Sequence, residues 1–274
     1  MLSYRFPLST LAAALVLAHG SASAQSGDQN PPPAEARSAE TVAAELANPL
    51  APITTFIAQF RTEFGNGPDD DTNYQLRLQP SLFKPFADGS AVLLRTTLPF
   101  RFNDWPTNDT GLGDLSLIPY YVPDMTRSTF VGYGGVLSIP TASDDALGSG
   151  KWSAGPALIF AKIGQPVVWG GLMQHIWSFA GKDSRGDVNV TTIQPFITYL
   201  LGGGWAIAAN TETSYNWDAS SGERWTVPIA ASVSKVVDLR GHFVNLGAAY
   251  INYVERPSYS PEWELRLNAQ YVFK

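Results

Sequence analysis

The chain has 274 residues, a formal net charge of −6 and a charged fraction of 15%, compared with about 25% in a typical soluble domain. Aromatic residues reach 12%, with 8 Trp and 11 Tyr, and cysteine is absent. The acidic balance argues against a nucleic-acid partner, and the lack of cysteine excludes a disulfide framework, a thiolate metal site and a cysteine nucleophile.

The first 24 residues have the pattern of a secretory signal. A weakly basic start precedes a short apolar core over 8–17, and Ala22, Ser23 and Ala24 form an A-x-A cleavage site. The apolar core is too short for a transmembrane anchor. We therefore expect residues 1–24 to be a signal peptide that is removed on secretion.

Residues 25–52 differ from the rest of the chain and are predicted to be a flexible linker. A triple proline within them is incompatible with a helix or a central strand. Ser38 as N-cap, with Val42 and Leu46 on one side, predicts a short helix over 38–47. Such a helix is too short to be stable alone in water. We expect a partly ordered tether, with a helix docked at the mouth or inside the lumen of the following domain as the alternative.

The remaining residues, 53–274, divide into twelve strand-like segments separated by clusters of Gly, Asp, Asn or Pro. No later stretch has the roughly 18 uninterrupted apolar residues of a spanning helix, so a membrane interpretation requires a barrel. The even number of segments agrees with bacterial single-chain barrels. The segments cover approximately residues 56–64, 72–85, 90–102, 112–122, 129–140, 151–161, 167–180, 188–200, 205–216, 224–235, 243–253 and 262–273.

The last segment, 262–273, carries the clearest pattern. Apolar side chains from Trp263 to Phe273 alternate with charged or polar ones from Glu262 to Gln270. Aromatic residues lie at both ends of the apolar face, and the segment is about as long as a tilted membrane strand. We predict the closing strand of a transmembrane antiparallel up-and-down β-barrel, which the barrel assembly machinery would engage. A secreted β-sandwich is the competing fold.

The connections between the segments give an independent indication of a membrane barrel. If both termini face the periplasm, the links after odd-numbered strands face outward, and these links are the longer and more acidic set. Carboxylates are hard ligands, so these loops are candidates for binding divalent cations. No stretch has the spacing of an EF-hand loop, so we predict solvated charge clusters and no metal site. The strongest clusters are Asp69, Asp70 and Asp71, and Asp144 with Asp145.

Charged residues of the first, second, third and last strands point into the lumen by parity. Barrel closure would place them on one wall, which five arginines and two glutamates make net positive. A basic wall in a narrow pore favours anionic solutes. The alternative is a structural Arg/Glu ladder that fills the bore, because interior charges need partners. These residues are Arg61, Glu63, Arg77, Arg95, Arg101, Glu264 and Arg266, with Glu212 added from the ninth strand.

An outer-membrane lipid hydrolase is a further alternative, because outer-membrane phospholipases form twelve-stranded barrels. His175 and Ser178 are the candidate pair, but a spacing of three on one strand puts them on opposite faces. We expect His175 to be a satisfied lumen residue. The sequence contains no G-x-S-x-G elbow, zinc motif or phosphate loop, so we predict neither an enzyme nor a cofactor.

A series of short motifs carries a family resemblance. Each motif is weak alone, but their order makes the series specific. They are Gly111-Leu112-Gly113-Asp114, Ile139-Pro140-Thr141-Ala142, Leu147-Gly148-Ser149-Gly150-Lys151-Trp152, Ala154-Gly155-Pro156, His175-Ile176-Trp177-Ser178, Gln194-Pro195-Phe196 and Trp225-Thr226-Val227-Pro228.

Together these motifs resemble the Gram-negative outer-membrane family catalogued as meta-pathway phenol-degradation proteins, many of whose members are called transporters. The resemblance covers roughly residues 48–274 and implies an outer-membrane barrel that takes up aromatic or other small hydrophobic compounds. It carries over no catalytic or binding residue.

We therefore predict a barrel in the bacterial outer membrane, in contact with its lipid, that acts as a passive channel for small solutes. Aromatic or anionic compounds are the candidate solutes. The main alternative is a structural or interaction barrel with a plugged lumen.

Overall fold

The computed structural model describes residues 37–48 and 53–273. The expected signal peptide, 1–24, and the first part of the expected linker lie outside the described residues. The elements are α1 (Ala39–Leu46), β1 (Thr55–Asn66), β2 (Asp71–Pro85), β3 (Ala91–Asn103), β4 (Asp109–Leu112), β5 (Leu115–Val122), β6 (Thr129–Ile139), β7 (Lys151–Lys162), β8 (Val167–Gly181), β9 (Asn189–Gly202), β10 (Trp205–Thr211), β11 (Thr213–Asn216), β12 (Trp225–Asp238), β13 (Phe243–Glu255) and β14 (Trp263–Val272).

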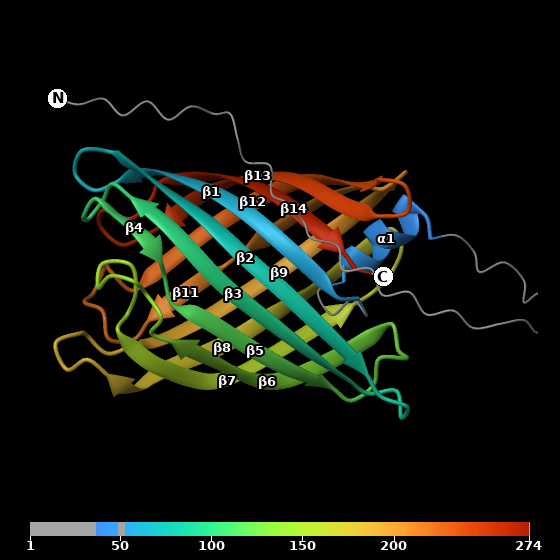
Figure 1. The fold of residues 1–274 in the computed structure, drawn as a ribbon, viewed down its shortest axis with the longest axis horizontal. Coiled ribbons are helices and arrows are strands. Elements are labelled where there is room, and N and C mark those ends of the chain that lie inside the picture. The colour runs from blue at the N-terminus through green and yellow to red at the C-terminus, as the bar shows by residue number, and fades with distance from the viewer. Residues whose placement is uncertain (1–36, 49–52, 274) are drawn as a thin grey trace, which may run out of the picture. The chain divides into compact units, whose positions relative to one another are not determined.

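The strands form one antiparallel sheet that closes on itself (Figure 1). Closure is made by β1 and β14, which pair from Thr55 opposite Val272 to Phe64 opposite Trp263. β4 and β5 both pair with β3, and β10 and β11 both pair with β9 and β12, so each couple is one interrupted strand. The wall therefore has the twelve strands that the sequence predicts. Closure leaves none of the strands in the described part of the chain with an unpaired edge, which a sheet surrounded by lipid requires.

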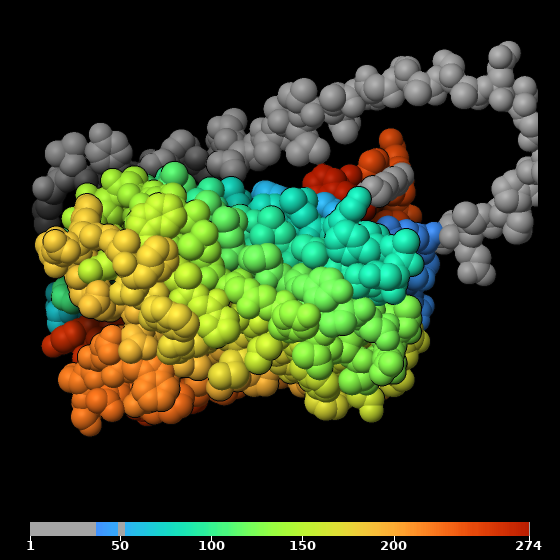
Figure 2. Space-filling view, turned by 90° about the horizontal axis from the view of Figure 1, so that it is seen from below, coloured from blue at the N-terminus to red at the C-terminus, as the bar shows by residue number. Residues whose placement is uncertain are grey.

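Apolar side chains cover the outer face of the barrel. Along the closing seam, Phe60 and Leu267 face each other outside with 40% and 58% of their surface exposed, whereas Arg61 and Arg266 face inward with 5% and 8% exposed. Figure 2 shows part of the continuous outer surface, formed by the green to yellow strands. This alternation is the predicted one for a barrel in lipid.

Aromatic rings gather at both ends of the outer face. At the end where β1 is linked to β2, which we call the loop end, the rings of Phe64 and Trp263 stack with their centroids 3.9 Å apart. At the opposite end, the helix end, the rings of Tyr271 and Phe273 meet edge to face at 4.9 Å. Two such bands are typical of barrels whose ends lie at the membrane interfaces.

The inner wall is not polar throughout, in contrast to the alternation of apolar and polar residues in the last strand. Inward-facing side chains of β3 and of β5 to β7 form an apolar cluster that includes Tyr120, Phe130 and Ile159, all at most 5% exposed. A barrel of this size is narrow enough for side chains of neighbouring strands to pack against one another. The cluster also accounts for the apolar residues on both faces of β8, where Trp169 faces outward and Leu172 packs inside.

Helix α1 lies at the helix end, beside the end of β14 (Figure 1). Ser38 caps it by accepting a hydrogen bond from the Thr41 amide at 3.1 Å. Val42 is fully buried in a cluster with Val236 and Phe243 on the inner wall. Residues 39–46 thus form a docked helix, which is the alternative to a tether, because burial of its apolar side on the barrel stabilises a helix too short to stand alone. No helix among the described residues is long and apolar enough to cross a membrane.

Candidate functional site

The predicted lumen residues of β14, β1, β2 and β3 lie on one inner wall. The strand register places Arg266 opposite Arg61, Arg61 opposite Gln75, and Gln75 opposite Arg101. Three arginines therefore occupy one row across four adjacent strands. Arg77 and Arg95 lie on the same faces of β2 and β3, nearer to the helix end. We call these four strands the basic wall.

Part of the basic wall is a compensated ion-pair network at the closing seam. Glu264 is fully buried and accepts hydrogen bonds from Arg61 Nε at 2.8 Å and Nη2 at 2.5 Å, and from Arg266 Nε at 2.8 Å. Tyr253 donates to the same carboxylate at 3.1 Å, and Glu63 lies 3.3 Å from Arg61. Two positive and two negative charges cancel here. This part of the wall corresponds to the structural Arg/Glu ladder.

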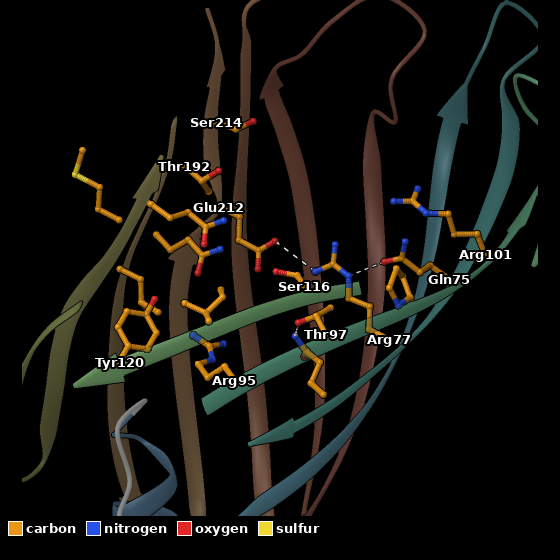
Figure 3. A pocket seen from close by; sticks show the side chains of 17 residues that line it. Gln75, Arg77, Arg95, Thr97, Arg101, Ser116, Tyr120, Thr192, Glu212 and Ser214 are labelled. Atoms are coloured by element: carbon orange, nitrogen blue, oxygen red, sulfur yellow. Dashed lines mark hydrogen bonds and ion pairs between the residues drawn. The ribbon is translucent and has the colours of Figure 1, made fainter. Parts of the chain in front are cut away.

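Arg77 reaches across the lumen (Figure 3). Its Nε donates to Gln75 Oε1 at 2.6 Å, and its Nη1 lies 4.0 Å from Glu212 Oε2. Glu212 lies between β10 and β11, which do not neighbour β2 in the sheet. A separation of 4.0 Å is too long for a strong hydrogen bond, so this pair bridges the bore only loosely.

Arg95 and Arg101 have no ion-pair partner among the described residues. The Nε of Arg101 is buried without a hydrogen-bond partner. The predicted lumen set holds five arginines and three glutamates, so its net charge is +2, and these two residues supply the excess. Interior charges are retained where water or a solute can satisfy them, so the excess marks a site suited to an anion.

A cavity of about 320 Å³ lies between the basic wall and the strands opposite (Figure 3). Its glutamine, threonine and serine side chains supply both hydrogen-bond donors and acceptors. The inward-facing residues that line it are Gln75, Arg77, Gln79, Arg95, Thr97, Pro99 and Arg101 from β2 and β3, Ser116, Ile118 and Tyr120 from β5, Leu172, Gln174, Thr192 and Gln194 from β8 and β9, and Glu212 and Ser214 from the interrupted strand.

Several of these cavity residues were not anticipated from the sequence. The inward direction of the glutamines of β8 and β9 could not be recognised in the sequence, because apolar residues occupy both faces of β8. Ile118 and Leu172 were not anticipated because inward positions were expected to be polar. Two inward glycines of β6 make room for the apolar side: a Cβ on Gly132 would lie 2.8 Å from Ile159, and one on Gly134 would lie 1.8 Å from a backbone oxygen.

At the loop end, the link 140–150 folds onto the interruption between β4 and β5. Leu147 is only 2% exposed although it belongs to a loop. The Asp114 carboxylate accepts hydrogen bonds from the amide and the hydroxyl of Ser149, both at 2.7 Å, and Arg185 donates to the Gly148 oxygen at 2.8 Å. The motifs that carried the family resemblance therefore fix this loop over the wall.

The five predicted acidic loop residues lie at the loop end. Asp69 and Asp70 are exposed in the turn between β1 and β2, and Asp71 begins β2. Asp144 accepts a hydrogen bond within its own loop, and Asp145 pairs with a lysine of the next loop. No group of three or more His, Cys, Asp or Glu among residues 37–48 and 53–273 is placed to hold a metal ion.

His175 is not in the lumen, so its expected location is wrong. Gln174 lies opposite Thr192 and faces the cavity, so the next residue, His175, faces outward. There its Nδ1 is hydrogen-bonded to Thr191 Oγ1 at 2.9 Å. Its ring centroid lies 5.3 Å from that of Trp177 in the outer aromatic band. The Ser178 hydroxyl instead donates to an aspartate at 3.1 Å. This geometry gives no support to a His–Ser hydrolytic pair.

Comparison with known proteins relates the barrel to solved structures. No family model and no curated protein matches the sequence. The COG4313 outer membrane channel from Pseudomonas putida F1 is similar in structure, with a TM-score of 0.65 and 16% identity over 81% of this chain and 95% of that chain. The NanC porin gives a TM-score of 0.55 and 11% identity over 81% and 99%. At these identities the likeness is one of fold: the chain has the fold of outer-membrane barrels.

Proposed function

We propose that this chain is a passive channel of the bacterial outer membrane for small anionic solutes. The observation that carries the proposal is the excess of two arginines, Arg95 and Arg101, in a lumen whose other predicted charges are paired. Fixed positive charge in a narrow hydrated bore attracts anions and repels cations. The two similar structures, an outer membrane channel and a porin, support the channel role.

The outer face supports the location. It is apolar along the seam and carries aromatic bands at both ends, which suits contact with membrane lipid. The resemblance to the phenol-degradation family adds aromatic compounds to the candidate solutes. Insertion by the barrel assembly machinery through β14 remains a prediction.

A second hollow lies at the helix end of the basic wall. A cavity of about 510 Å³ at the helix end is lined by Ala91 at the start of β3, together with Phe83 and Met125. Arg95, on the same face of β3, lines the central cavity. Both hollows border β3, and Leu93, the inward residue between Ala91 and Arg95, is only 2% exposed in the apolar cluster, so a solute that passes from one hollow to the other has to pass beside that cluster.

The alternative, a structural barrel with a plugged lumen, is favoured by three features: the Arg/Glu network at the seam, the docked α1 and the buried Leu147. Reconstitution separates the two functions. The purified protein is first shown to be folded by a shift in gel mobility between unboiled and boiled samples. It is then placed in liposomes, and the uptake of a small carboxylate is compared with that of a cation of similar size.

The channel proposal expects faster uptake of the carboxylate, and slower uptake in a variant carrying Arg95→Gln and Arg101→Gln. The matched control is Arg127→Gln, because this arginine is exposed in the link between β5 and β6 and pairs with Asp124 outside the lumen. A folded protein that passes neither solute contradicts the channel and supports the plugged barrel.

A further inference from the structure

The central cavity has two chemically different sides that meet at Arg95. The register places Arg95 of β3 opposite Ile118 of β5, and the next inward pair toward the helix end is Leu93 and Tyr120. Figure 3 shows Arg95 and Tyr120 on the same side of the cavity. A positive charge and an apolar surface are therefore immediate neighbours.

The apolar side is preformed. Tyr120 is 1% exposed and belongs to the buried cluster, and Ile118 and Leu172 pack against that cluster. Leu172 comes from β8, which lies beyond β6 and β7 from β5 in the sheet. We call Ile118 and Leu172, which the buried Tyr120 supports from behind, the apolar shelf. Because the shelf is supported by packed residues behind it, a ligand does not have to order it on binding.

Arg95 and Arg101 are the two cavity arginines without an ion-pair partner among the described residues, and Arg95 is the one that lies beside the apolar shelf. Arg61 is held by Glu264, and Arg77 is held by Gln75 and faces Glu212. The polar neighbours of Arg95 do not engage it, since Gln79 donates to Thr97 at 3.1 Å. A guanidinium group matches a carboxylate with two parallel hydrogen bonds, which makes a free arginine a specific carboxylate receptor.

We propose that the central cavity contains a binding site for monocarboxylates whose other end is a compact apolar group. This inference rests on the proposed channel function and names its substrate class. Arg95 holds the carboxylate, and the apolar shelf covers the opposite end of the solute. The cavity volume of about 320 Å³ restricts the solute to a small ring or a short branched chain.

Three other solute classes fit the site less well. An inorganic anion uses Arg95 but leaves the shelf uncovered, and a neutral hydrocarbon or alcohol leaves Arg95 without a charged partner. A dicarboxylate places its second charge against Ile118 and Leu172, where desolvation is unfavourable. The site therefore selects solutes with a single charge at one end.

The test measures how strongly each probe reduces the chloride current through single channels in planar bilayers. The probes are cyclohexanecarboxylate, acetate and cyclohexanol, which separate the charge from the apolar group. We expect cyclohexanecarboxylate to reduce the current at a concentration at least tenfold below that of acetate, because its ring buries several methylene groups on the shelf. Cyclohexanol at the same concentration should leave the current unchanged.

Two variants assign the effect to the two sides of the site. Arg95→Gln should abolish block by both carboxylates. Leu172→Asn should reduce the preference for cyclohexanecarboxylate over acetate about tenfold, because it removes only the apolar contact, and the block is expressed relative to the chloride current of the same variant. Arg127→Gln is the matched control and should behave as the parent protein. Gel mobility of unboiled samples shows that each variant is folded.

The outcomes separate this inference from the channel function. An anion-selective channel that is blocked equally by cyclohexanecarboxylate and acetate overturns the site and leaves the channel standing. If the folded protein carries no current, binding is measured directly by saturation-transfer NMR of cyclohexanecarboxylate on the detergent-solubilised protein. A signal that is equal in the parent protein and in Arg95→Gln then overturns the site as well.

Discussion

Glu264 is the carboxylate that Arg61 and Arg266 share at the closing seam of the barrel. Its fully buried carboxylate receives hydrogen bonds from Arg61, Arg266 and Tyr253 where β1 meets β14. Removing one partner of a buried ionic cluster leaves the others uncompensated, which typically costs about 3–5 kcal/mol. The residue therefore matters for closure of the barrel rather than for contact with solutes.

Glu264→Gln should lower the free energy of unfolding by about 3 kcal/mol, because two arginines lose their shared carboxylate. Urea titration of the detergent-solubilised protein, followed by tryptophan fluorescence, measures the change. Glu63→Gln is the control and should cost less, since Glu63 makes one ion pair at 3.3 Å and remains partly exposed. Equal losses in the two variants would show that the network does not depend on Glu264.

Glu212 has the opposite role, because it opposes the positive lumen. Glu212→Gln removes a negative charge from the cavity and releases Arg77 from its partner at 4.0 Å. We expect stronger anion selectivity, read from the reversal potential in a salt gradient. Glu223→Gln makes the same charge change in the link between β11 and β12, outside the bore, and should have no effect. A selectivity that both substitutions change equally would point to surface charge instead of the lumen.

Among the elements, α1 packs on the inner wall at the helix end of the bore. Val42→Asp places a charge where Val236, Phe243 and Val272 now bury the helix, so α1 should leave the inner wall. Single-channel conductance should rise, because the mouth widens. Glu40→Ala, on the exposed side of the same helix, should keep the parent conductance. An unchanged conductance in Val42→Asp would mean that α1 does not limit the passage.

The link 140–150 gives a pH-dependent prediction at the loop end. A hydrogen bond and the charge of Lys182 hold the pKa of Asp145 below its ordinary value of 3.8. The Lys151 hydrogen bond does the same for the pKa of Asp187. A lowered folded-state pKa stabilises these contacts above the ordinary value, and the contribution is lost as the pH falls through the lowered value.

Current noise from loop movement should therefore be constant between about pH 7 and pH 5 and should rise below about pH 4. Lys182→Gln should raise the noise already at neutral pH, because Asp145 then has no partner on the neighbouring loop. Open-channel recordings over this pH range measure the current noise. Noise that changes between neutral pH and pH 5 would show that groups other than these aspartates control the loop movement.

At the scale of the whole molecule, the strand pattern was predictable because period-two alternation and turn residues are local signals. The interruption at Gly113 and Asp114 was not, since it depends on a loop that follows two strands later and docks there. The docking of α1 and the apolar shelf were hidden for the same reason. They depend on which side chains face one another after closure, and apolar residues on both faces of β8 give no local sign of this.

The central claim is that the barrel encloses a positively charged, solute-accessible lumen. The reversal potential of the parent protein in a planar bilayer with a salt gradient tests it most directly. The structure predicts discrete conductance steps and a reversal potential of the sign given by anion permeation, reduced by Arg95→Gln with Arg101→Gln. A potential of the opposite sign, or a folded protein without conductance, would contradict it.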